Sequence, residues 1–180
     1  MDKVIAYTDG SATTKYPYLG GFGVYIKHSG QSIRFRKGYS CTKTGRMELM
    51  AALYCLRAIR DKSMRVLVYS DSQYVCNTCN EWIDRWESQL WLDKKNVDLL
   101  KQLIVELRVF RHRPEFRHIK GHQEVTNKHT HGNNIADELA SYKTQSSYEV
   151  DLPLDDLTTF EREDFTEVDG KLYYQRETVS

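Results

Sequence analysis

The sequence lacks any long hydrophobic run, and none of its apolar stretches approaches the length of a transmembrane helix. It begins MDKVIAYTDGSA and enters a strand-like pattern at once, so we expect no secretory signal peptide. The four cysteines do not have the spacing of a disulfide scaffold, and repeats and low-complexity tracts are missing. These features argue against a membrane protein or a disulfide-rich secreted domain. They predict free thiols in a reducing, cytoplasmic compartment.

The charge is balanced over the whole chain but not along it. The net charge is +1, yet residues 1–145 contain 23 Lys and Arg against 15 Asp and Glu, a balance of +8. Residues 146–180 contain 3 against 10, a balance of −7. The basic part predicts a polyanionic partner. The acidic tail could shield that part or dock a protein, and the sequence leaves its role open.

The hydrophobic pattern predicts an α/β fold. At 180 residues the chain is long enough for one domain with a substantial core. Strand-like runs cover 3–8, 20–28, 32–39, 65–70 and 115–121. Helix-like runs cover 45–59, 71–86, 96–110 and 134–143, with Thr44 as the expected cap of the first. We expect a five-stranded mixed sheet, an antiparallel three-strand meander plus two parallel strands, flanked by helices.

The chain divides by composition into two predicted regions. Residues 1–145 form the expected main domain, and residues 146–180 form an acidic C-terminal extension. Within the extension, LDDLTTFERE favours a short helix, and the Asp169–Gly170 pair favours a hairpin turn. Partial disorder of the extension is the alternative.

Four carboxylates fall near the ends of predicted elements. Asp9 and Asp71 directly follow two strands, and Glu48 and Asp137 lie one turn into two helices. Each alone could be a helix cap or could complement a helix dipole. Together, at the carboxyl edge of a parallel strand pair, they would repel one another unless a cation is bound. Oxygen ligands alone suit Mg²⁺ or Mn²⁺, and two such ions suit phosphoryl chemistry.

Six motifs occur in an order that resembles the ribonuclease H type 1 family. They are TDGSA, GRMELMAAL, SDSQYV, KNVDLL, KGH and NNIADELA, spread over about Lys3 to Tyr142. The resemblance implies a ribonuclease H-like fold and an endonuclease that hydrolyses the RNA strand of RNA–DNA hybrids. It implies catalysis with two Mg²⁺ ions, which Mn²⁺ can replace, and products with 5′-phosphate and 3′-hydroxyl ends. Cleavage should be largely independent of sequence, because phosphate contacts carry no base information.

The resemblance also implies roles for individual residues. Asp9, Glu48, Asp71 and Asp137 correspond to the four catalytic, metal-binding acids of the family. His122, in IKGHQ, corresponds to a loop histidine that moves a proton or helps product release. The expected substrate-binding residues are Gly10, Ser11, Lys43, Thr44, Gln73 and Asn133. The expected partner is the hybrid duplex, and we expect a monomer with no membrane association and no obligate protein partner.

Two regions depart from the family pattern. Lys43 stands where the family often has a threonine that contacts a DNA-strand phosphate, and it could act there as a point charge. Thr44 replaces an asparagine that contacts the minor groove. The segment WESQLWLDKKN is short and not basic where bacterial members carry a basic handle. We therefore predict weaker binding through this segment and a larger role for the pair Lys94–Lys95.

Other interpretations remain open. A related nuclease or strand-transfer enzyme could share the fold, although such relatives usually lack the RMELMAA helix. A non-catalytic hybrid-binding module would be expected to have lost a carboxylate, and all four are present. The CNTC motif at 76–79 could suggest redox or zinc chemistry, but it lies inside a predicted helix, which favours buried structural thiols. The histidines do not have a standard zinc-ligand spacing.

Overall fold

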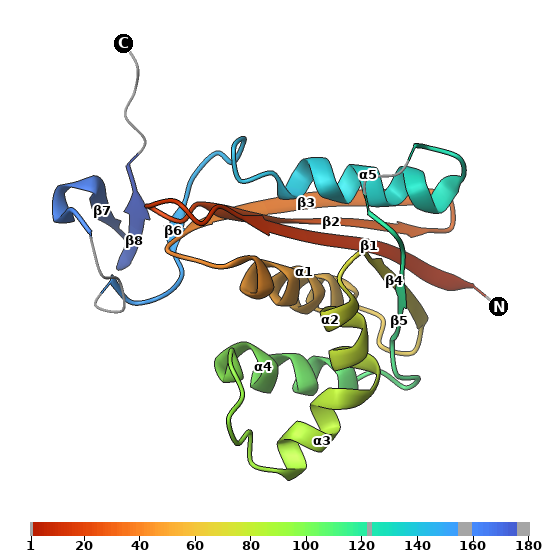
Figure 1. Ribbon diagram of the computed structural model, residues 1–180. Helices are drawn as coiled ribbons and strands as arrows, with labels where there is room; N and C mark the ends of the chain where they lie inside the picture. Colours follow the sequence, from red (N-terminus) through yellow and green to blue (C-terminus); the bar gives the residue numbers. More distant parts are fainter. Residues whose placement is uncertain (1, 122–123, 155–159, 176–180) are drawn as a thin grey trace.

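The computed structural model describes residues 2–121, 124–154 and 160–175, and it shows one mixed sheet with helices on both faces (Figure 1). The sheet order is β5-β4-β1-β2-β3-β6-β8-β7. The strands are β1 (Lys3–Ala12), β2 (Gly20–His28), β3 (Gln31–Ser40), β4 (Arg65–Ser70), β5 (Glu115–His118), β6 (Glu149–Val150), β7 (Phe165–Val168) and β8 (Lys171–Tyr174). The helices are α1 (Thr44–Ala58), α2 (Gln73–Asn77), the π-helical turn η1 (Thr78–Trp82), α3 (Ile83–Ser88), α4 (Val97–Arg108), α5 (Lys128–Ala140) and the short 3-10 turn η3 (Arg162–Asp164).

The central five strands have the predicted topology. β1, β2 and β3 form the antiparallel meander, and β4 and β5 run parallel to β1. The expected α/β class is therefore confirmed. The sheet nevertheless has eight strands rather than five, because the tail adds β6, β8 and β7 beside β3. β6 contains only Glu149 and Val150, which is too short to produce a readable hydrophobic pattern.

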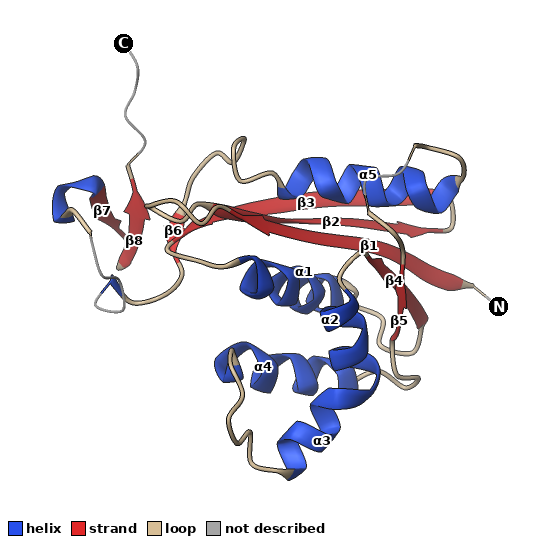
Figure 2. Ribbon diagram, viewed as in Figure 1, coloured by secondary structure: helices blue, strands red, loops and turns tan. Residues whose placement is uncertain are grey.

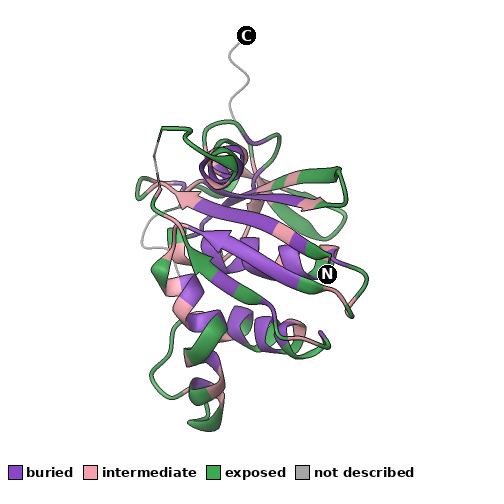
Figure 3. Ribbon diagram, turned by 90° about the vertical axis from the view of Figure 1, so that its right-hand side faces the viewer, coloured by how far each residue is buried: buried purple, intermediate pink, exposed green. Residues whose placement is uncertain are grey.

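Helices cover the two faces of the sheet unequally, as Figure 2 shows. α1 packs on one face with α4 outside it, and its Leu49, Leu53 and Leu56 are fully buried in the larger core. α5 lies on the opposite face above a smaller core that contains stacked tyrosines Tyr7 and Tyr69. The central strands are buried along most of their length, whereas the ends nearest the N-terminus are exposed (Figure 3). In the described part of the chain, no helix is long and apolar enough to cross a membrane.

Several predicted boundaries change. The N-cap of α1 is Lys43 rather than Thr44, and it makes no side-chain capping bond. α5 begins six residues earlier than expected, because Asn127 and Thr130 form a capping box that starts the helix at Lys128. β5 ends at His118, three residues short of the predicted end.

The four cysteines are free and buried, as expected for structural thiols. Cys76 and Cys79 lie within the continuous helical segment formed by α2 and η1, so the CNTC motif is part of the core. In the tail, β7 and β8 pair in the predicted hairpin around Asp169 and Gly170. Residues 155–159 of the short helix expected over 154–163 lie outside the described ranges, and Arg162–Asp164 form the 3-10 turn η3.

Candidate active site

Two of the four acids lie where the parallel pairing of β1 with β4 ends. β1 itself continues to Ala12 along β2, so Asp9 lies within the strand, whereas the sequence pattern predicts it directly after the strand. β1 and β4 pair in register up to Thr8 and Ser70, so Asp9 and Asp71 come next on the two strands. This is the carboxyl edge of the parallel pair, where ligands bind in open α/β sheets. The backbone N–H of Gly10 donates a hydrogen bond to Asp9 Oδ1 at 2.9 Å, which helps to fix the carboxylate.

The third acid is brought in by close packing of α1 against β1. A Cβ atom placed on Gly10 would lie 2.4 Å from the backbone nitrogen of Glu48 and from the carbonyl carbon of Met47. Only glycine permits this approach, and it places Glu48 beside Asp9. One carboxylate oxygen from each of Asp9, Glu48 and Asp71 lies within 4.8 Å of the other two.

The fourth acid reaches the cluster from the opposite face of the sheet. Asp137 lies in α5 and is outside the group of three, but it is close enough to contribute to the raised pKa of Asp9. Acids from the edge of the parallel pair and from two helices therefore converge as the sequence pattern predicts. The two innermost side chains are almost inaccessible, since Asp9 is 4% exposed and Glu48 8% exposed.

The electrostatics of the cluster are unfavourable without a cation or protons. Burial raises the pKa of the Asp9 carboxyl, and the charges of Glu48 and Asp71 raise it further. Burial also raises the pKa of Glu48, with Asp71 as the next cause. Among the described atoms, Glu48 Oε2 is buried and has no hydrogen-bond partner. A hard divalent cation would satisfy that oxygen and relieve the repulsion, so the residues fit such an ion.

Gly121, in the loop after β5, packs against the cluster of acids. A Cβ atom on Gly121 would lie 2.7 Å from Asp71 Oδ2, so this glycine backs directly onto the carboxylate. His118 Nε2 lies 3.0 Å from the backbone oxygen of Asp71. The sequence motifs assign His118 no role, although it lies at the carboxyl end of a parallel strand beside Asp71. His122 falls outside the described residues.

The expected substrate-binding residues differ in accessibility. Lys43 and Thr44 are exposed at the start of α1, and Gln73 is exposed at the start of α2. Asn133 is only 2% exposed, and its Oδ1 has no partner among the described atoms. The Ser11 hydroxyl donates to the carbonyl oxygen of Ala140 at 2.7 Å, so that group is already engaged within the protein.

The segment that replaces the basic handle is packed through its tryptophans. Trp86 is buried, Trp82 packs against it at a centroid distance of 5.7 Å, and Trp91 packs against the same core. Lys94 Nζ lies 4.8 Å from the centroid of the Trp86 ring. The rings therefore have the expected packing role and are not free platforms for base stacking.

Comparisons with known proteins agree with this arrangement. A family model described as RNase H matches residues 1–145. A ribonuclease H of Chlorobium luteolum is 42% identical over 150 residues, covering 79% of this chain and 96% of the relative. A ribonuclease HI of Vibrio cholerae is 34% identical over 155 residues, covering 83% of this chain and 94% of the relative.

Solved structures show the same fold. The protease–reverse transcriptase of prototype foamy virus matches with a TM-score of 0.69 and 25% identity over 78% of this chain, which spans only 20% of that protein. A structure of LC11-RNase H1 in complex with an RNA/DNA hybrid matches with a TM-score of 0.57 and 22% identity. That match covers 77% of this chain and 94% of the other.

Proposed function

The chain belongs to the ribonuclease H family, and on that premise we propose that it hydrolyses the RNA strand of RNA–DNA hybrids at the four acids. The observation that carries the proposal is the group formed by Asp9, Glu48 and Asp71, whose oxygens lie within 4.8 Å of one another at the carboxyl edge of the sheet. Cleavage leaves 5′-phosphate and 3′-hydroxyl ends. Residues 1–145 are the catalytic part, and residues 146–180 are an extension built onto its sheet.

Asp9, Glu48, Asp71 and Asp137 would hold two divalent cations, Mg²⁺ or Mn²⁺. When bound, such ions activate water as the nucleophile and stabilise the leaving oxygen. The protein supplies the fixed positions of the ligands. The Gly10 amide fixes Asp9, and the buried Leu49 and Leu53 anchor α1 so that Glu48 is held on a rigid element.

His122 is the residue we assign to proton transfer or product release. A neutral imidazole can carry a proton near pH 7. Its neighbour Gly121 packs against Asp71, which supports a place for this loop beside the reacting phosphate. The assignment predicts that a His122 variant loses turnover more than it loses affinity for the hybrid.

The exposed residues around the acids would contact the hybrid. Lys43 would meet a backbone phosphate as a point charge, and Gln73 would face the minor groove. Glu48 and the backbone of Gly10 and Ser11 would contact the 2′-hydroxyls, the groups that distinguish RNA from DNA. Thr44 is exposed and would contact the hybrid directly. Asn133 is buried and would help to orient the site.

The decisive experiment compares an end-labelled RNA–DNA hybrid, double-stranded RNA and double-stranded DNA with and without Mg²⁺. We expect cleavage of the hybrid alone, only with the metal, and none by Asp9→Asn. Asp61→Asn is the matched control, because Asp61 is an exposed carboxylate in a distant turn. Full cleavage by Asp9→Asn would show that the acids are assigned wrongly. Binding without cleavage would identify a non-catalytic module, and strand joining would identify a transferase.

The cysteines bear on the cellular compartment. Four buried free thiols support a reducing compartment such as the cytoplasm. We expect the chain to act as a monomer on the duplex, and sedimentation of the purified protein tests that expectation.

A further inference from the structure

A group of basic side chains lies at the opposite end of β1 and β4 from the acids. Lys3 and Arg65 are register partners at the starts of the parallel strands β1 and β4. Side chains alternate along a strand, so Arg65 is on the same face as Leu67, which belongs to the core beneath α5. The two cations therefore stand side by side on the α5 face, at the exposed strand ends seen in Figure 3.

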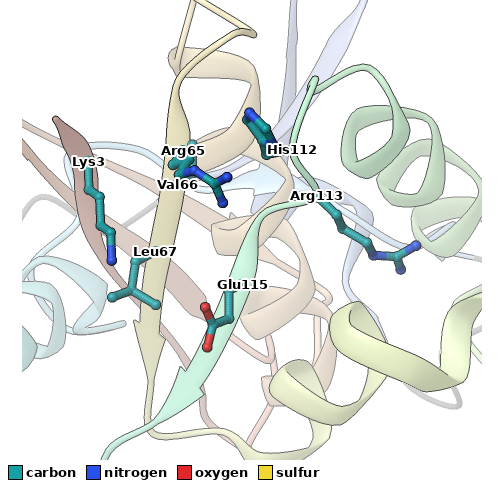
Figure 4. A pocket seen from close by; sticks show the side chains of 7 residues that line it. All are labelled: Lys3, Arg65, Val66, Leu67, His112, Arg113 and Glu115. Atoms are coloured by element: carbon teal, nitrogen blue, oxygen red, sulfur yellow. The ribbon is translucent and has the colours of Figure 1, made fainter. Parts of the chain in front are cut away.

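A pocket of about 70 Å³ opens between these residues (Figure 4). It is lined by Lys3, Arg65, Val66, Leu67, His112, Arg113 and Glu115. Arg113 is already engaged, since it donates to the carbonyl oxygen of Cys79 and pairs with Asp84, both at 2.7 Å. Figure 4 shows its guanidinium pointing away from the others. By contrast, Lys3 and Arg65 form no ion pair within the described residues.

The positive charge continues across the same face toward α5. Lys27 lies beside Ile5 in the register of β1 and β2, and Arg117 lies beside Tyr69 in that of β4 and β5. Lys27, Arg117 and Lys128 all lie close enough to His129 to lower the pKa of that imidazole, after the effect of its burial. Lys27, Arg117 and Lys128 therefore lie around His129, although they come from β2, β5 and α5.

We call Lys3, Lys27, Arg65, His112 and Lys128 the amino-end patch; Arg117 is left out because it lies opposite Tyr69, nearer the acids, and is paired with Glu115. The acids beside it are Asp2, next to Lys3 in the chain, and Glu115, whose Oε1 is held by Arg117 at 3.0 Å. A second groove, of about 340 Å³, lies on the other side of Lys3 and is lined by Lys27 and the β2–β3 turn. Lys3 therefore stands between two concave surfaces within an excess of positive charge.

We propose that the amino-end patch binds backbone phosphates of nucleic acid at a contact separate from the active site. Lysine and arginine without acidic partners, beside a small pocket, suit phosphate oxygens and carry no base preference. Six residues of β1 separate Lys3 from Asp9, which is roughly 20 Å at 3.3 Å per residue. That distance equals about six base pairs of duplex. A hybrid longer than the cleaved segment, or a second nucleic acid, would supply the phosphates; the choice of a hybrid as probe rests on the proposed function.

The test compares two double variants that each remove two exposed cations. Lys3→Ala/Arg65→Ala removes the pair in the patch. Arg60→Ala/Lys101→Ala removes two exposed cations from the end of α1 and from α4, away from the α5 face. Binding of a 30-base-pair hybrid is measured by fluorescence anisotropy over a range of salt concentrations, with a chelator present so that no cleavage occurs. The binding readout remains valid even if the protein proves to have no nuclease activity.

We expect the patch variant to lose about 5-fold or more in affinity at ~0.1 M salt. The slope of log affinity against log salt should fall by about 2, roughly 0.9 per lost phosphate contact. The control should keep the wild-type slope. An unchanged slope in the patch variant, or an equal loss in both variants, overturns the proposal.

Two further arms locate the contact and its source. Amide resonances of Val66 and His112 should shift when hybrid is added to the wild type, and the shifts should disappear in the patch variant. If inorganic phosphate shifts these resonances but the hybrid does not, the assignment to nucleic acid is overturned. Binding to phosphatidylglycerol vesicles without binding to the hybrid overturns it as well. A loss of affinity seen with the 30-base-pair hybrid, and absent with a hairpin-capped hybrid of 4 base pairs that is too short to span the two sites, supports one duplex reaching both sites. An equal loss at both lengths supports a separate molecule.

Discussion

Arg46 and Asp151 form a buried two-pronged ion pair that joins the acidic tail to the first turn of α1. Arg46 Nε lies 2.7 Å from Asp151 Oδ2, and Nη2 lies 3.0 Å from Oδ1. Their side chains are 6% and 4% exposed. Asp98 binds the other side of the guanidinium, and Thr42 donates to Asp151 Oδ2 at 2.7 Å. Because Arg46 is two residues before Glu48, the tail helps to hold the helix that brings Glu48 to the cluster of acids.

Asp151→Ala should therefore destabilise the protein. Removing one partner of a buried pair costs roughly 3–5 kcal/mol, but Asp98 still compensates Arg46, so we expect about 1–3 kcal/mol. Urea unfolding followed by circular dichroism measures the change. Glu163→Ala, which removes an exposed tail carboxylate, should change stability by less than about 0.5 kcal/mol. Equal effects of the two substitutions would show that the buried pair contributes no specific stabilisation.

The cluster of acids should make the metal-free protein less stable at high pH. The pKa values of Asp9 and Glu48 are raised in the folded state. A raised carboxyl pKa contributes stability below the unfolded value, and that contribution is lost as the pH rises through the folded value. With a chelator present, Asp9→Asn should thus be more stable than the wild type at pH 8, by about 1–3 kcal/mol, and closer to it at pH 4.

Mg²⁺ should reverse that difference, since a cation that binds only the folded state stabilises it by mass action. The wild type should gain stability at pH 8 when Mg²⁺ is added, and Asp9→Asn should gain much less. Thermal unfolding with and without the metal measures both, with Asp61→Asn as the control that behaves as the wild type. A wild type whose stability is unaffected by both pH and Mg²⁺ would contradict a metal site at these acids.

The site acids could be predicted from the sequence because each follows or lies within a recognisable hydrophobic pattern. Asp71 follows a short apolar strand, Asp9 follows the apolar run KVIAYT within β1, and the RMELMAA helix has a clear buried stripe behind Glu48. The parallel placement of β4 beside β1 then brings the strand acids together, and the right-handed crossover rule narrows the strand orders that allow it. Asp137 lies in a helix whose predicted start was late, but the helix itself was identified.

The tail strands and their anchor could not be predicted in the same way. β6 is two residues long and is held by contacts such as that of Asp151 with Arg46, which lies 105 positions earlier in the chain. No local propensity encodes such a pairing. The early start of α5 was overlooked for a different reason. Its first turn is polar and Gly132 follows directly, so hydrophobic periodicity is absent there, although the Asn127 and Thr130 capping box is a readable signal.

Lys43→Ala should weaken binding of the hybrid and leave the chemical step unchanged. Lys43 is exposed at the start of α1, so it can reach a phosphate without rearrangement of the core. One lost phosphate contact should raise KM several-fold and lower the salt slope of binding by about 1. Steady-state cleavage assays measure KM and kcat separately, with Lys101→Ala as a control of equal charge on α4. A fall in kcat at constant KM would place Lys43 in the reaction rather than in binding.

Gly10→Ala should abolish most of the activity through the position of Glu48. A Cβ atom at Gly10 would lie 2.4 Å from backbone atoms of Met47 and Glu48, so α1 must move away from β1. A displacement of about 1 Å at an active site can cost roughly 100-fold in rate. Gly45→Ala is the matched control. Gly45 lies in α1, the helix that carries Glu48, and a Cβ atom there would meet nothing within 4 Å. That substitution should slightly stabilise the helix and leave cleavage unchanged. Circular dichroism of Gly10→Ala separates a moved helix from an unfolded chain. If a folded Gly10→Ala protein cleaved the hybrid at the wild-type rate, close packing of α1 on β1 would not be what positions Glu48.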